Sequence, residues 1–146
     1  MSIVDRTERG QIETIAFELE LEHSPAKVWR ALTDPELLRQ WLLPVVGFEL
    51  TQGTSFQLQA PPQPTWDGAV SCRILEIEPQ RKLRYTWTVP FLDTVVTFTI
   101  TPTATGTRLH IEQSGFTRDQ KRESGGARFG WKMMGGRLID LLATLS

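Results

Sequence analysis

The sequence predicts an α+β domain in which a curved antiparallel sheet of about seven strands wraps around a long C-terminal helix. Apolar and polar residues alternate with a period of two in several segments before residue 112. Two helix-start signals follow the first of these segments, and after residue 127 the apolar spacing changes to three and four. Because the sheet and the helix each present one apolar face, packing them together buries both.

The first strand is predicted from Ile15 to Glu22, where apolar and polar side chains alternate. The pair Ser24-Pro25 is typical of a helix start, since the serine caps free amides and the proline fits the first turn. A short helix is therefore expected from Pro25 to Leu32. Asp34-Pro35 repeats the same signal, so a second short helix should run toward Trp41.

Six further strands are predicted between this helix pair and the C-terminal helix. They cover Val45–Leu50, Thr54–Gln59, Val70–Ile77, Leu83–Val89, Val96–Ile100 and Leu109–Ile111. Residues 60–65 contain three prolines and are expected to form a surface connection. The apolar phase of the third of these strands changes after Ile74, which indicates a bulge or a strand covered on both sides.

The last helix is expected from Ala127, after a polar loop at residues 115–126 that can run into the helix start. Its apolar residues are Trp131, Met134, Leu138, Leu141, Leu142 and Leu145. The chain shows neither an internal repeat nor a second block of elements. We therefore expect one domain over residues 1–146, with a core from about residue 12 to 145.

Composition excludes several classes of function. The chain has 146 residues, 16 basic and 17 acidic, so no long-range field attracts nucleic acid. Neither a signal peptide nor a stretch of membrane-spanning length is evident, so we expect no membrane insertion and a cytoplasmic location. The single cysteine, Cys72, lies in a strand pattern and is expected to be a small buried side chain. The sequence does not predict an oligomeric state.

No catalytic group, metal site or cofactor site is predicted. A metal needs several converging ligands, and the chain has two histidines. His23 is expected at a strand end, and His110 on the outer face of a strand beside a glutamate. The glycine pairs Gly125-Gly126 and Gly135-Gly136 do not have the spacing of a phosphate-binding loop.

The expected interior is unusual in its aromatic and glycine content. The chain has five tryptophans, which are either core residues or the walls of a cavity. Gly135 and Gly136 interrupt the last helix at a cost of about 1 kcal/mol each relative to alanine. They indicate either close approach of the helix to the sheet or empty volume opposite a cavity. Met133 and Met134 fit ordinary core packing or an adaptable wall.

Several ordered motifs resemble one protein family. They are Ser24–Leu38 followed by Trp41, Leu75–Pro79 leading to Leu83–Trp87, Gly106–Leu109, Ser114–Phe116 and Gly130-Trp131. In this order they resemble the activator-of-Hsp90-ATPase homologue group of the START-like (SRPBCC) superfamily, over about residues 12 to 145. The resemblance implies the helix-grip fold, also called Bet v 1-like. The chain departs from the family pattern at Leu42-Leu43-Pro44, where the family usually has an aromatic residue directly after the tryptophan.

The resemblance also implies a function, namely binding of a small hydrophobic or aromatic ligand between the sheet and the last helix, without catalysis or a cofactor. Residues predicted to line this cavity are Trp41, Phe48, Phe56, Trp87, Phe98, Trp131, Met134 and Leu138. Two alternatives stay open. One is an interaction module that acts on an Hsp90-type chaperone, and the other is a polyketide cyclase-like enzyme.

Overall fold

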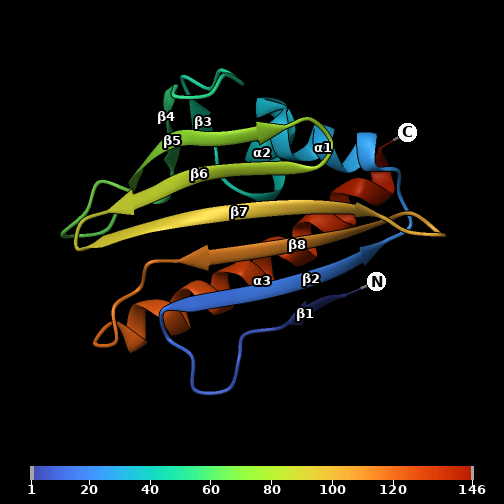
Figure 1. Ribbon diagram of the computed structural model, residues 1–146. Helices are drawn as coiled ribbons and strands as arrows, with labels where there is room; N and C mark the ends of the chain where they lie inside the picture. The colour runs from blue at the N-terminus through green and yellow to red at the C-terminus, as the bar shows by residue number, and fades with distance from the viewer. Residues whose placement is uncertain (1, 146) are drawn as a thin grey trace.

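The computed structural model describes residues 2–145 as an antiparallel eight-stranded sheet with helices behind it (Figure 1). The strand order is β1-β2-β8-β7-β6-β5-β4-β3. The strands are β1 (Ile3–Asp5), β2 (Thr14–Leu21), β3 (Val45–Val46), β4 (Ser55–Gln59), β5 (Ala69–Glu78), β6 (Lys82–Val89), β7 (Leu92–Pro102) and β8 (Thr107–Ser114). The helices are α1 (Pro25–Thr33), α2 (Pro35–Trp41) and α3 (Lys121–Thr144). This arrangement confirms the predicted α+β fold class.

The tandem helices α1 and α2 form as their sequence signals predict. The Ser24 side chain accepts a hydrogen bond from the Lys27 amide at 3.2 Å at the start of α1. Asp34 ends α1 and caps α2, because its carboxylate accepts from the Glu36 amide at 2.9 Å. Each helix places a proline in its first turn.

The sheet curves away from α3 on one side. The pairing of β5 with β6 shifts register between Ile74 and Glu76, which confirms the bulge that the phase change indicated. A bulge increases the local twist and bends its strand. The helix α3 packs closely against β1, β2, α1 and α2, whereas β4, β5 and β6 lie farther from it. The helix and this part of the sheet thus enclose a widening space that side chains must fill.

The strand β1 is an element that the sequence did not predict. It pairs with β2, with Ile3 opposite Leu19, and Ile3 packs against the core. The structured region therefore begins well before residue 12, and the sheet has eight strands rather than about seven. Three residues are too few to show a period of two, so the pattern could not reveal this strand.

Several predicted boundaries were wrong, and two of them have a clear physical reason. The strand β3 ends at Val46 instead of Leu50, because Gly47 adopts a left-handed backbone with φ of 74°. The helix α3 begins at Lys121 instead of Ala127. Its first turns lie at the surface and lack an apolar spacing. Ser124 is their one buried residue, and its hydroxyl donates to the Ile12 carbonyl at 3.1 Å.

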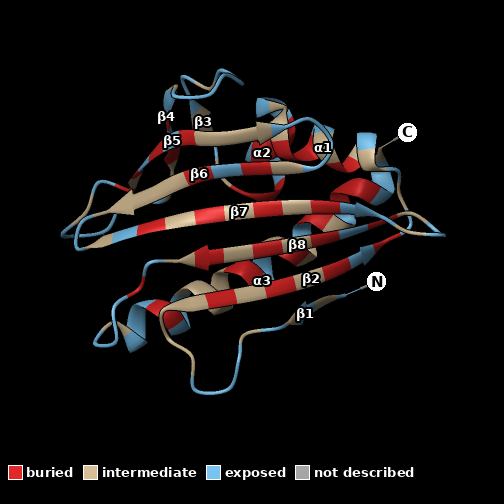
Figure 2. Ribbon diagram, viewed as in Figure 1, coloured by how far each residue is buried: buried red, intermediate tan, exposed pale blue. Residues whose placement is uncertain are grey.

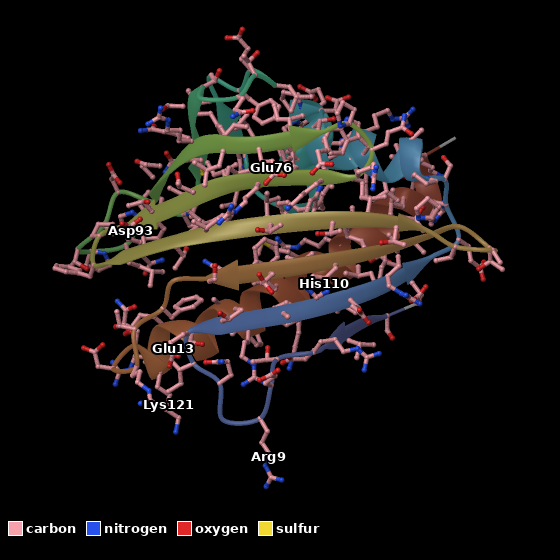
Figure 3. The ribbon with its side chains drawn as sticks, in the orientation of Figure 1. Arg9, Glu13, Glu76, Asp93, His110 and Lys121 are labelled. Atoms are coloured by element: carbon pink, nitrogen blue, oxygen red, sulfur yellow. The ribbon has the colours of Figure 1, made fainter. Side chains whose placement is uncertain are left out.

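Buried and exposed side chains alternate along the strands, and the inward ones form one continuous core (Figure 2). Cys72 is buried in this core, as predicted. Glu76 and His110 lie on the opposite, outer face of the sheet (Figure 3). Across residues 2–145, no helix combines the length and apolar character needed to cross a membrane.

Gly135 marks a close approach of α3 to the sheet. A Cβ atom at this position would lie 2.5 Å from Ile3 Cδ1, whereas a Cβ at Gly136 would meet no atom within 4 Å. Of the two explanations for this glycine pair, close approach therefore applies to Gly135, and the partner strand is β1.

Candidate functional site

A chain of aromatic rings fills the space between α3 and the strands β4 to β7. We call this chain the aromatic wedge, and its members are Trp41, Phe48, Phe56, Tyr85, Trp87, Phe98 and Trp131. Neighbouring ring centroids lie between 5.0 and 6.4 Å apart, and most pairs meet edge to face. Offset and edge-on contacts of this kind are the favoured geometry for aromatic side chains. All six aromatic residues predicted to line a cavity are thus members of one contact chain.

The predicted residues divide into a closed interior and a partly exposed rim. Trp41, Phe98, Trp131 and Leu138 are at most 1% exposed, and Phe56 is buried with them. Phe48, Trp87 and Met134 are partly buried, and we call these three the rim. The structure therefore brings the six predicted aromatic residues together in one ring chain, while Leu138 and Met134 belong to the same hydrophobic core. Phe48 and Trp87 are the rings of the wedge that lie partly exposed at the rim.

A buried chain of hydrogen bonds fixes the rings at the centre of the wedge. The indole nitrogen of Trp131 donates to the Gln113 side-chain oxygen at 2.8 Å. The Gln113 amide nitrogen donates to the Thr94 hydroxyl at 2.9 Å, and this hydroxyl donates to the Trp87 carbonyl at 2.8 Å. Gln113 and Thr94 are both buried. Satisfied polar groups in a low-dielectric interior hold their neighbours rigidly, so α3, β8, β7 and β6 are tied together here.

Sequence reasoning missed Gln113 and Thr94, although a signal was present. Gln113 continues the inward phase of Leu109 and Ile111 in β8, and Thr94 precedes Val96 in the inward phase of β7. A polar residue in an apolar phase indicates a buried partner. The partner itself, the Trp131 indole, lies on another element and could not be identified from spacing.

The ionisable groups in this interior are held neutral. Burial raises the pKa of Tyr85 well above its usual value, and the neighbouring Cys72 adds to the effect. Burial also raises the pKa of the Cys72 thiol to about 12. Neither group ionises near neutral pH, so neither supplies a nucleophilic anion or a general base.

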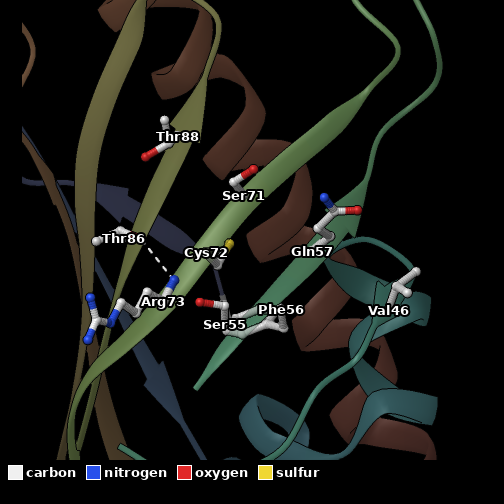
Figure 4. Close-up of a pocket in the computed structure, with 9 residues that line it drawn as sticks. All are labelled: Val46, Ser55, Phe56, Gln57, Ser71, Cys72, Arg73, Thr86 and Thr88. Atoms are coloured by element: carbon white, nitrogen blue, oxygen red, sulfur yellow. Dashed lines mark hydrogen bonds between the residues drawn. The ribbon is translucent and has the colours of Figure 1, made fainter. Parts of the chain in front are cut away.

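A separate hollow of about 530 Å³ lies on the outer face of the sheet (Figure 4). Six of its nine lining residues have polar side chains, and the Thr86 hydroxyl there accepts from the Arg73 amide at 2.8 Å. The residues around it are Val46, Ser55, Phe56, Gln57, Ser71, Cys72, Arg73, Thr86 and Thr88. This hollow shares only Phe56 with the predicted cavity residues.

The histidines and acidic residues do not assemble into a metal centre. Within residues 2–145, no group of three histidine, cysteine or acidic side chains converges. His23 Nδ1 lies 3.0 Å from Lys27 Nζ at the end of β2. His110 Nδ1 lies 3.8 Å from Glu18 Oε2 on the outer face, beside a strand glutamate as predicted.

Comparison with solved structures gives the same fold. A protein from Mesorhizobium loti, MLL2253, is 41% identical and superposes with a TM-score of 0.84 over 91% of this chain and 98% of its own. CV1439 from Chromobacterium violaceum is 26% identical, with a TM-score of 0.74 over 90% of this chain and 98% of its own. CalU16 from Micromonospora echinospora, at 24% identity, has a TM-score of 0.70 over 97% and 89% of the two chains.

The family model for activator of Hsp90 ATPase homolog 1-like proteins matches residues 22–143. A search of curated proteins gave no match. The matched range contains α1, α2, almost all of α3, the strands β3 to β8 and the whole aromatic wedge. The chain therefore belongs to the family of activator of Hsp90 ATPase homolog 1-like proteins.

Proposed function

We propose that this chain binds a small hydrophobic or aromatic molecule in the aromatic wedge, between the sheet and α3. The observation that carries the proposal is the divergence of α3 from β4, β5 and β6, which leaves the intervening space to be filled by side chains. Sites for small molecules are concave and mostly apolar, with a few placed polar groups. The wedge has this composition, with aromatic rings around the Trp131–Gln113–Thr94 chain.

The partly exposed rim is the entrance through which a ligand reaches the wedge. Phe48 and Trp87 are partly exposed and each contacts a more deeply buried ring, Phe56 at 5.0 Å and Trp131 at 5.8 Å. Each such ring contact contributes about 0.5–1.5 kcal/mol beyond the burial of apolar area. An aromatic ligand that displaces a rim ring can form the same kind of contact with the buried ring, and so recover this energy. Met134 completes the rim with an unbranched, flexible side chain that adapts to different occupants.

The test is a calorimetric titration with two neutral aromatic probes, naphthyl methyl ketone and ethylnaphthalene. The wild-type protein should bind at least one of them saturably at one site. Met134→Trp adds bulk at the rim and should weaken binding at least about tenfold, since overfilling a packed site is unfavourable. Met133→Trp is the matched control, because Met133 is the next residue on α3 and is 47% exposed.

Equal loss of binding in the two methionine variants, or no binding by the wild type up to the solubility of both probes, would refute the proposal. Native mass spectrometry of freshly purified protein, followed by solvent extraction, is an independent search for a natural ligand. A retained molecule should be displaced by whichever probe binds.

A second candidate function is contact with an Hsp90-type chaperone, as the family description suggests. The observation that favours it is the outer face of α3, where Phe129 is 70% exposed and Met133 is 47% exposed. Exposed apolar side chains close together are typical of interaction surfaces. Addition of this protein should then change the ATPase rate of the chaperone, and Phe129→Ala should reduce that change. An unaltered rate with the wild-type protein would exclude this function.

We propose no catalytic step for the chain. A cyclase-like reaction needs an acid or base poised near the working pH. The ionisable side chains in the wedge region, Tyr85 and Cys72, stay protonated there. Binding without chemistry is the function that the arrangement supports.

A further inference from the structure

The Tyr85 hydroxyl is a polar group in the interior of the wedge without a hydrogen-bond partner among the described residues. Its residue is 2% exposed, yet the hydroxyl makes no hydrogen bond to any residue between 2 and 145. In that same range, the one fully enclosed side-chain nitrogen or oxygen without a partner is His23 Nε2. The Tyr85 oxygen is therefore not fully enclosed, and it touches accessible space at the end of an otherwise buried ring.

The surroundings of this hydroxyl are aromatic. The Tyr85 ring lies 5.2 Å from Phe56 and 5.8 Å from Phe98, centroid to centroid, in the middle of the ring chain. Among the other buried polar side chains at the wedge, Trp131, Gln113 and Thr94 bond to one another. The Trp41 indole nitrogen donates to the Ala31 carbonyl at 2.9 Å, and Trp87 lies at the partly exposed rim. A buried polar group is normally hydrogen-bonded, so a donor held among rings without a protein partner is suited to a ligand.

The interior also restricts the charge of that ligand. The buried polar residues of the described chain are Thr94, Thr107, Gln113 and Ser124, and none of them carries a charge. An ionised ligand would lose its hydration without gaining an opposite charge, which is strongly unfavourable. A neutral phenol can donate a hydrogen bond to an uncharged oxygen at a much lower desolvation cost.

We propose that Tyr85 is a specificity-determining residue, and that it selects neutral aromatic ligands carrying a hydrogen-bond acceptor such as a ketone or quinone oxygen. This inference rests on the proposed function and names its ligand class. The ring of the ligand packs in the wedge, and its oxygen accepts from the Tyr85 hydroxyl.

The test compares three probes of one ring size: naphthyl methyl ketone, ethylnaphthalene and naphthoate. Their dissociation constants are measured by calorimetry for wild type, Tyr85→Phe and Ser124→Ala. Tyr85→Phe should weaken ketone binding about tenfold, because the ketone oxygen loses its hydrogen-bond donor. Ethylnaphthalene has no such oxygen, so its dissociation constant should stay within about twofold of the wild-type value. Naphthoate should bind wild type at least about a hundredfold more weakly than the ketone.

Ser124→Ala is the control, because it also removes a buried hydroxyl, but one that bonds to Ile12 and lies outside the wedge. It should leave the ratio of ketone to hydrocarbon affinity unchanged. Tyr85→Phe removes no bond to a described residue, so its thermal midpoint should stay close to that of wild type, and a folded variant is expected.

The outcomes separate the two proposals. If the neutral probes bind and Tyr85→Phe leaves their affinity ratio unchanged, the role of Tyr85 is refuted while the proposed function stands. If naphthoate binds as tightly as the ketone, the neutral ligand class is refuted. If no probe binds wild type, the proposed function fails and this inference fails with it.

Discussion

Substitution of alanine for each glycine of the Gly135-Gly136 pair tests how α3 meets the sheet. At Gly135 the new Cβ would lie 2.5 Å from Ile3 Cδ1, 3.2 Å from Ile3 Cβ and 3.3 Å from Ile3 Cγ1. Side-chain rotation moves Cδ1 away but leaves Cβ in place, so β1 itself must shift. Overpacking of this kind costs about 1–3 kcal/mol. The helical preference of alanine over glycine returns about 1 kcal/mol.

Gly136→Ala is the matched control, because its Cβ meets no atom within 4 Å and it gains the same helical preference. Helix propensity therefore cancels in the comparison, and Gly135→Ala should be less stable than Gly136→Ala by about 1–3 kcal/mol. Urea unfolding followed by circular dichroism measures this difference. Equal stabilisation by both substitutions would show that β1 does not pack on α3, and that empty volume faces Gly135 instead.

Three further predictions follow from individual contacts. Trp131→Phe should lower the free energy of unfolding by about 1–3 kcal/mol, because it leaves the buried Gln113 oxygen without its donor; a loss below about 0.5 kcal/mol in urea unfolding would contradict this. Burial alone would raise the pKa of Asp5, but hydrogen bonds from Thr7 and Arg128 outweigh it and lower the pKa from 3.8 to about 2. This carboxylate therefore stabilises the fold above pH 3.8 and loses its effect as the pH falls through about 2. Asp5→Asn should accordingly lower the free energy of unfolding by about 1–2 kcal/mol at neutral pH and by almost nothing near pH 2. An equal loss at both pH values in urea unfolding would count against the ion pair. Cys72, with its buried thiol of pKa about 12, should react with a thiol reagent only as fast as the protein unfolds, and labelling of the native protein at the rate of a free thiol would contradict its burial.

Elements with several turns or alternations were predictable from the sequence. The strand β2 and the capped helices α1 and α2 formed as expected, because their signals are local and repeat along the chain. Elements held by distant partners were not predictable. The short β1 is held by its pairing with β2 and by the bonds from Arg128 to Asp5 at 2.7 and 2.9 Å, across more than a hundred residues of chain.

The candidate site likewise has a part that the sequence could predict and a part that it could not. Period-two alternation shows which side of a strand a residue occupies, so Phe56, Trp87 and Phe98 could be assigned to the interior. Alternation does not show which polar groups meet. The bond from Trp131 to Gln113 and the unpartnered hydroxyl of Tyr85 depend on side-chain contacts between separate elements. These contacts, rather than the apolar pattern, are the basis of the proposed specificity.

The most direct test of ligand binding in the wedge is a nuclear magnetic resonance titration of the labelled protein with naphthyl methyl ketone. The indole N–H signal of each tryptophan reports on its own surroundings. We predict that the Trp87 and Trp131 indole signals shift saturably, with a common dissociation constant. Unchanged indole signals, with shifts confined to the backbone amides of Ser55, Arg73 and Thr86 around the outer hollow, would contradict it.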